Sequence, residues 1–257
     1  MSVRSALGLA LCAVLALGAG AASVQARSRA RASAATPLVQ GMIVGSTGAA
    51  LFGPRAVAAP EATVRVGKRS CNVAAGTPLA VLAAAARLGG PSFSLRDYGR
   101  CGSSPTSSAQ LFVYSLGGET NRGQNGWEYK VNGTSGTTGA GDPSGPSGNG
   151  RRLQSGQQVL WFWCAASGGG CERTLEVRVA ATIVSRGGSL NVTVLGRDNE
   201  GHAQPVAGAI VSLGSDFAST ATNGRATLIV PSERGTYQLS TKRHALVPSF
   251  PETISVR

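Results

Sequence analysis

Charged and aromatic side chains are scarce in this chain. Of its 257 residues only 14% are charged and 5% are aromatic, and there are two histidines, His202 and His244. So few charges exclude long helices held together by salt bridges. A zinc site of the ordinary kind is not expected either, since no two cysteines have C-x-x-C spacing and both histidines lie elsewhere in the sequence.

The usual patterns of a catalytic site are missing as well. Serines are plentiful, but there is no Gly-x-Ser-x-Gly elbow, and Asp97 and Asp142 are isolated rather than paired. His202 and His244 fall in expected loops, and their spacing suggests no nucleophile–base pair. We therefore expect a protein that is not an enzyme, with a secreted hydrolase of unrecognised type kept as an alternative.

The N-terminus has the pattern of a secretory signal peptide over residues 1–26. Arg4 precedes an apolar run at 6–22, and Val24-Gln25-Ala26 is a small-x-small cleavage signal. A membrane helix is the competing interpretation, but the run is short, and the arginine-rich stretch 27–36 that follows is expected to be a disordered arm. No later stretch is long and apolar enough to span a bilayer. The mature chain is therefore expected in the cell envelope or outside the cell.

Export changes how the cysteines are interpreted. Cys12 lies within the signal, which leaves Cys71, Cys101, Cys164 and Cys171. Four cysteines in an oxidising compartment predict two disulfides, for which three connectivities are possible. The order along the chain favours Cys71–Cys101 and Cys164–Cys171.

The net charge of +12 is spread over the N-terminal two thirds of the chain. Dense basic pairs include Lys68-Arg69 and Arg151-Arg152. Nucleic-acid binding is not expected, because there is no recognised motif and no basic stripe. For an exported protein the charge indicates attraction to an anionic envelope or glycan, or simply solubility.

One helix is expected among many short strands in the first part of the chain. Thr77 is a natural N-cap, Pro78 suits the first helical position, and Gly89-Gly90 ends the apolar helical pattern. A helix packed across a small mixed sheet is an α+β layout such as a β-grasp. The expected strands are 38–44, 49–57, 62–66, 70–73, 92–95, 110–116, 126–133 and 159–164.

Two of these strands carry all three tryptophans. In the first, Trp127 and Tyr129 alternate with Glu128 and Lys130, which predicts a half-buried strand. The second, residues 159–164, is apolar on both faces and therefore predicts a strand that is buried on both sides. Such strands form either the core of a small domain or a binding wall. In the second case the ligand contacts would be Trp127, Tyr129, Asn132, Trp161 and Trp163, although Asn132-Gly133 also suits a tight turn.

Three segments carry a resemblance to a known family. They are Ala75-Gly-Thr-Pro-Leu79, Gly126-Trp-Glu-Tyr-Lys-Val-Asn-Gly133 and Ser155-Gly-Gln-Gln-Val-Leu-Trp-Phe162. Together they resemble the transcobalamin C-terminal-like domain, over about residues 37–171. The resemblance implies a ubiquitin-like β-grasp fold. It also implies a corrinoid ligand, which in the animal members is held together with a separate helical domain. The residues themselves indicate no cofactor, and the long loop 134–150 is expected to be either functional or disordered.

After Cys171 the composition changes to short strands separated by turn signals. This cadence predicts an all-β sandwich over 172–257. The patterns Pro-Val-x-Gly-Ala-x-Val, Thr-x-Gly-x-Ala and Gly-x-Tyr-x-Leu resemble carboxypeptidase-regulatory-like (prealbumin-like) and bacterial Ig-like modules, which implies a spacer or adhesion unit. The expected strands are 174–180, 189–195, 209–213, 225–230, 236–241 and 252–256.

The leading functional prediction is a secreted or cell-envelope binding protein without catalysis. Its ligand class is left open between a small molecule and an envelope glycan, and a corrinoid is implied by the resemblance only. The alternative is a structural or adhesion protein of the surface, in which the aromatic side chains are all core. Neither nucleic acid nor a metal is expected as a partner.

Overall fold

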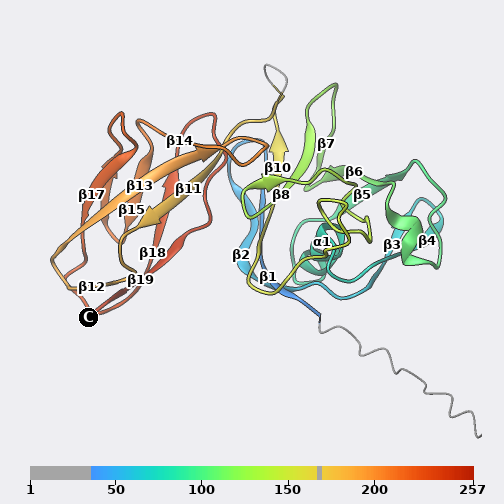
Figure 1. Cartoon of the computed structure of the whole chain (residues 1–257), viewed down its shortest axis with the longest axis horizontal. Coiled ribbons are helices and arrows are strands. Elements are labelled where there is room, and N and C mark those ends of the chain that lie inside the picture. Colours follow the sequence, from blue (N-terminus) through green and yellow to red (C-terminus); the bar gives the residue numbers. More distant parts are fainter. Residues whose placement is uncertain (1–35, 167–169) are drawn as a thin grey trace, which may run out of the picture. The chain divides into compact units, whose positions relative to one another are not determined.

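The structure, a computed structural model, describes residues 36–166 and 170–257. The expected signal peptide at 1–26 and nearly all of the expected arm at 27–36 lie outside the described residues. Within them the chain is mostly β-strand, with one α-helix (Figure 1). Among the residues described, no helix has the length and hydrophobicity that crossing a membrane requires.

The first sheet has two long-range neighbours at its centre. β1 (Leu38–Val44) runs parallel to β10 (Gln158–Cys164). β2 (Ala50–Ala58) extends the sheet beyond β1, while β8 (Gly126–Val131) and β9 (Thr134–Ser135) extend it beyond β10, each antiparallel to its neighbour. Six of the seven residues of β10 are buried. The prediction of a strand covered on both faces is confirmed.

The helix α1 (Pro78–Arg87) packs against β1 and β2 (Figure 1). Eight of its ten residues are buried, because small and apolar side chains occupy nearly every position. Thr77 is the N-cap, Pro78 stands at the first position, and the chain leaves the helix through Gly89, whose φ is 86°. All three features were predicted from the sequence.

Thr77→Ala is expected to lower the free energy of unfolding by about 1 kcal/mol. The Thr77 hydroxyl accepts a hydrogen bond from the Ala80 amide (3.2 Å) and donates one to the Ala74 carbonyl (2.9 Å), and the residue is fully buried. Alanine would leave both partners unpaired. Unfolding in denaturant measures the loss, and Thr77→Ser, which keeps the hydroxyl, is the control. Equal losses in both variants would show that the methyl group matters and the cap does not.

Two small sheets complete the first core. β3 and β4 form a hairpin, and β6 pairs with both β5 and β7. A disulfide joins Cys71 on β4 to Cys101 beyond β5, with the Cα atoms 5.3 Å apart. The bounds are Ala62–Val66 for β3, Arg69–Val73 for β4, Phe93–Asp97 for β5, Leu111–Leu116 for β6, Glu119–Thr120 for β7 and Pro105–Ser108 for the short 3-10 helix η1.

The remaining strands form a β-sandwich around a second core. One sheet has the order β11-β13-β14, with β17 also paired to β13, and the other has the order β12-β19-β18-β15-β16. Val194, Leu213 and Leu239 are fully buried between the sheets. The bounds are Thr174–Val179 (β11), Ile183–Val184 (β12), Ser189–Arg197 (β13), Ala203–Pro205 (β14), Ile210–Leu213 (β15), Asp216–Ser219 (β16), Arg225–Ile229 (β17), Gly235–Lys242 (β18) and Glu252–Val256 (β19).

A second disulfide lies where the first set of strands ends. Cys164, the last residue of β10, is bonded to Cys171, and their Cα atoms are 5.0 Å apart. Both disulfides have the pairing that the order of the cysteines favours.

The strands expected from the sequence are all present, with ends that differ by a few residues. The sequence did not indicate five shorter ones, because two to four residues are too few to display an alternating pattern. The expected boundary between the two domains, at residues 171 and 172, stays a prediction. The β-grasp assignment also stays a prediction. The strands that were missed are β7, β9, β12, β14 and β16.

Candidate functional site

The aromatic strands β8 and β10 lie side by side, as predicted. In their antiparallel register Trp161 faces Tyr129, and Trp163 faces Trp127. The ring centroids are 5.5 Å apart in the first pair and 5.8 Å apart in the second, which meets edge to face. All four rings are at most 8% exposed and belong to the same core as α1.

The polar atoms of three of these rings are bound within the same core. The indole nitrogens of Trp127 and Trp161 donate to the carbonyls of Glu119 (3.0 Å) and Pro78 (3.3 Å). The Tyr129 hydroxyl donates to the carbonyl of Thr138 (2.9 Å), and burial raises the pKa of Tyr129. Buried Trp and Tyr generally need such partners. The donors are therefore satisfied without a ligand.

The loop 134–150 is folded against the helix entrance. The Leu79 amide donates to the Ala140 carbonyl (2.8 Å), and the Ser108 hydroxyl donates to the Gly141 carbonyl (2.6 Å). Gly139 lies so close to the neighbouring backbone that a Cβ there would come within 2.0 Å of the Ala109 carbonyl oxygen. The loop thus covers the tyrosine side of the core.

Asn132 holds the turn between β8 and β9. Its φ of 49° and that of Gly133, 82°, are the left-handed values that a two-residue hairpin turn requires. Its side-chain oxygen accepts a hydrogen bond from the Gln158 amide (2.9 Å). Asn132 therefore fixes the register of β8 beside β10, and it also lines a cleft described below.

Trp163 is the aromatic candidate closest to solvent, although it is only 8% exposed. It borders two hollows, of about 660 and 420 Å³. Arg122 and Asn125 line the smaller hollow, and Lys242 and His244 line the larger. Of the aromatic candidates, Trp163 therefore lies nearest to the surface.

The opposite face of β8 contains a buried lysine. The sequence predicts Lys130 on the polar, solvent-facing side of a half-buried strand, and this prediction is wrong, because the residue is 0% exposed. Its ammonium donates to the carbonyls of Asp198 (2.7 Å) and Arg197 (3.1 Å). Burial lowers the pKa of Lys130 to about 8, against the opposing attraction of nearby acids. Lys130 thus ties β8 to the end of β13.

A cleft of about 510 Å³ lies beside Lys130 and Asn132. Glu176 on its wall forms ion pairs with Arg178 and Arg197. Desolvation favours a higher pKa for Glu176, but the hydrogen bonds from these arginines outweigh it and lower the pKa. For Glu252, also on the wall, desolvation and the nearby Glu176 raise the pKa.

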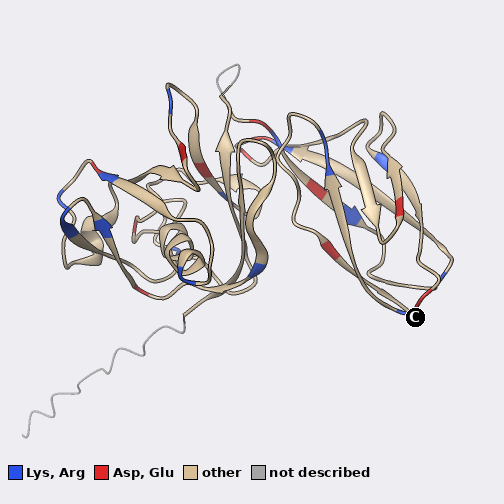
Figure 2. Ribbon diagram, turned by 180° about the vertical axis from the view of Figure 1, so that it is seen from behind, with Lys and Arg blue, Asp and Glu red and all other residues tan. Residues whose placement is uncertain are grey.

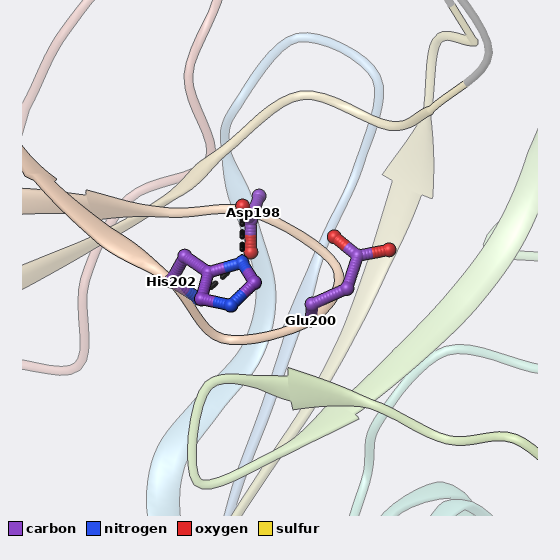
Figure 3. A group of neighbouring side chains, drawn as sticks. All are labelled: Asp198, Glu200 and His202. Atoms are coloured by element: carbon purple, nitrogen blue, oxygen red, sulfur yellow. Dashed lines mark hydrogen bonds and ion pairs between the residues drawn. The ribbon is translucent and has the colours of Figure 1, made fainter.

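A carboxylate and imidazole group lies on the turn between β13 and β14. Asp198, Glu200 and His202 have potential ligand atoms within 4.8 Å of one another (Figure 3). Oxygen and imidazole ligands suit divalent cations. Asp198, however, already accepts hydrogen bonds from the amide (2.8 Å) and the ring (3.3 Å) of His202. Desolvation acts to raise the pKa of Asp198, but these bonds lower it. These hydrogen bonds within the turn between Asp198 and His202 account for the grouping without a metal ion.

Comparisons with known proteins add little. No family model matches the chain, and no curated protein matches it. Solved structures that are similar include the D00-D0 domain of Intimin, with 15% identity and a TM-score of 0.24 over 56% of this chain and 89% of that chain. The D0-D1 domain of Intimin has 14% identity and a TM-score of 0.24 over 50% and 80%. At such scores we transfer neither fold nor function.

Proposed function

We propose that this chain is an exported, non-enzymatic protein of the cell envelope or surface with a structural or adhesive role. The observation that carries the proposal is the burial of Trp127, Tyr129 and Trp161 against α1, with their polar atoms bound inside the core. Rings held in this way serve folding rather than ligand capture. The two disulfides support export, because such bonds persist in oxidising compartments.

The proposed organisation is a β-grasp domain over 37–171 followed by a sandwich domain over 172–257. The order β2-β1-β10-β8-β9, with a central parallel pair and a helix on one face, supports the β-grasp assignment and the resemblance to the transcobalamin C-terminal-like domain. The sandwich supports the resemblance to Ig-like and carboxypeptidase-regulatory-like modules, which act as spacers or adhesion units.

A second candidate function is the binding of a small molecule in the cleft beside Lys130. What favours it is the cleft itself, of about 510 Å³, where Asn132 and Glu252 join the lining. Clefts of this size commonly hold small ligands. A corrinoid enters here through the family resemblance alone. Trp163 borders the two other hollows and does not line this cleft, so Glu252 is the residue whose substitution reports on binding in it.

Cobalamin is expected to remain unbound when the whole chain is dialysed to equilibrium against it. Tryptophan fluorescence is likewise expected to stay constant when peptidoglycan fragments are added, since all three indoles are enclosed. Thiol labelling of the unreduced protein should find Cys71, Cys101, Cys164 and Cys171 unreactive.

The outcomes separate the two candidates. Retention of cobalamin that is lost in a folded Trp163→Ala protein would contradict the structural role and establish a ligand site at the aromatic strands. Retention that is lost with Glu252→Gln would place the ligand in the cleft. Four reactive thiols in protein isolated from its native compartment would overturn export.

A further inference from the structure

The β3–β4 hairpin and β5 bring cations from two parts of the sequence to one place. The hairpin carries Arg65, Lys68 and Arg69, and Arg96 and Arg100 lie on β5 and just beyond it. All five residues are exposed, and β3 contacts β5. Figure 2 shows the basic residues along this hairpin and the neighbouring strand. We call this group, with Tyr98 and Phe112, the hairpin surface.

Its framework is fixed by a buried acid and a disulfide. The Asp97 side chain, 1% exposed, pairs with Arg69 (3.0 Å) and accepts hydrogen bonds from the amides of Gly99 (2.9 Å) and Cys101 (3.1 Å). Cys101 is in turn bonded to Cys71 on the hairpin. Asp97 is therefore used internally and does not face a ligand. Because the backbone that carries the cations is already fixed, binding does not have to order it.

Aromatic rings lie among these cations. Tyr98 is 66% exposed and Phe112 is 39% exposed, and their centroids are 6.0 Å apart. The guanidinium carbon of Arg96 lies 3.5 Å from the centroid of the Tyr114 ring, which is a cation–π contact. Exposed rings beside arginines are typical of recognition surfaces.

The surface also has a strong imbalance of charge. From residue 61 to residue 116 the chain has six lysines and arginines and two acids, Glu61 and Asp97. The side chain of Asp97 is buried. An anionic partner is therefore favoured by charge complementarity.

We propose that the hairpin surface binds an acidic polysaccharide. Carboxylate or sulfate groups would pair with Arg65, Lys68, Arg96 and Arg100, since guanidinium groups match such oxyanions in a bidentate manner. The C–H faces of the sugar rings would stack on Tyr98 and Phe112. This inference deepens the proposed adhesive role and rests on it, because export is what brings the chain to envelope glycans.

The test is calorimetric titration of the whole chain with dextran sulfate, with neutral dextran as the uncharged match. Binding is expected for the sulfated polymer only and should weaken as salt rises. The variant R65S/K68S/R96S/R100S should bind at least about tenfold more weakly, as expected for four surface ion contacts. The matched control R186S/R225S/R234S/K242S removes the same charge from exposed sites in the sandwich and should bind within about twofold of the wild type.

A second variant separates a glycan from other anions. Y98S/F112S should weaken binding of dextran sulfate by about fivefold and leave the binding of vesicles of anionic phospholipid unchanged. Circular dichroism checks that each variant is folded. Equal losses in the two fourfold variants, or an unaltered titration with Y98S/F112S, would overturn the proposal. The titrations and the thiol labelling test different proposals. If the protein binds dextran sulfate but its four cysteines are reactive, export is overturned and the binding proposal is not.

Discussion

Trp161→Ala is expected to lower the free energy of unfolding by about 4 kcal/mol. Trp161 is 2% exposed and is the largest of the fully buried side chains. Its ring packs against Tyr129 at 5.5 Å, and its nitrogen donates to the Pro78 carbonyl at the start of α1 (3.3 Å). Alanine would create a cavity between the sheet and the helix and leave that carbonyl without its donor.

Denaturant unfolding followed by far-ultraviolet circular dichroism measures the change, since the remaining tryptophans complicate fluorescence. Phe217→Ala is the matched control, because that ring is 70% exposed and its loss should change stability by less than about 0.5 kcal/mol. If Trp161→Ala lowers the free energy of unfolding by less than about 1 kcal/mol, the ring does not support the core. The interpretation of the aromatic strands as a ligand-binding surface would then be favoured.

Lys130→Ala is expected to lower the free energy of unfolding by about 3 kcal/mol. The variant leaves the Arg197 and Asp198 carbonyls without their donor and opens a gap beside Phe162, whose ring lies 5.7 Å from the ammonium. Lys130→Met fills most of the gap and should cost about 2 kcal/mol, which isolates the hydrogen bonds. Lys68→Ala, at an exposed lysine of the hairpin, is the control. If Lys130→Met leaves the free energy of unfolding unchanged, water replaces the hydrogen bonds of the ammonium without loss of stability.

The same lysine gives the wild type a distinctive dependence on pH. Its pKa is about 8 in the folded chain, compared with 10.5 for a free lysine side chain. Between these values the unfolded chain holds the proton that the folded chain has released. Stability should therefore rise with pH from about 8 to about 10, by at most about 1.4 kcal/mol per pH unit relative to Lys130→Met. If the difference in stability between the wild type and Lys130→Met does not change with pH, the pKa of Lys130 lies near its ordinary value.

Lys130 also shows where sequence reasoning fails. Alternation in β8 predicted a solvent-facing lysine, whereas β10, apolar on both faces, predicted a sheet covered on both sides. The second pattern was the better guide at Lys130, which lies beside the buried Leu160 of β10, whereas Glu128 on the same face of β8 is exposed as the alternation predicted. The partners of Lys130, the carbonyls of Arg197 and Asp198, lie more than sixty residues further along the chain and left no local signal.

The aromatic candidates illustrate a different limit. Core and binding wall call for the same residue types in the same alternation, so the pattern at Trp127 and Trp161 cannot distinguish them. The distinction lies in the partners, the carbonyls of Glu119 and Pro78, which only the folded chain brings close. Local features were predicted correctly: the Thr77 cap and the Asn132-Gly133 turn each depend on nearby residues. The disulfide pairing was predicted from the order of the cysteines along the chain.

The hairpin surface falls between these cases. Lys68-Arg69 was visible as a basic pair, but Arg96 and Arg100 are some thirty residues away. The pairing favoured for Cys71 and Cys101 already implied that these segments meet. The signal was thus present in the sequence, but in the cysteines rather than in the charges.

The parallel pair at the centre of the first sheet has a consequence for how the chain matures. β1 is among the first strands to be synthesised, but its Gln40 can pair with Gln158 only after β10 has been made. Pairing across so long a separation is slow to form. In the export proposed above, the first sheet would therefore close only after β10 had crossed the translocation pore.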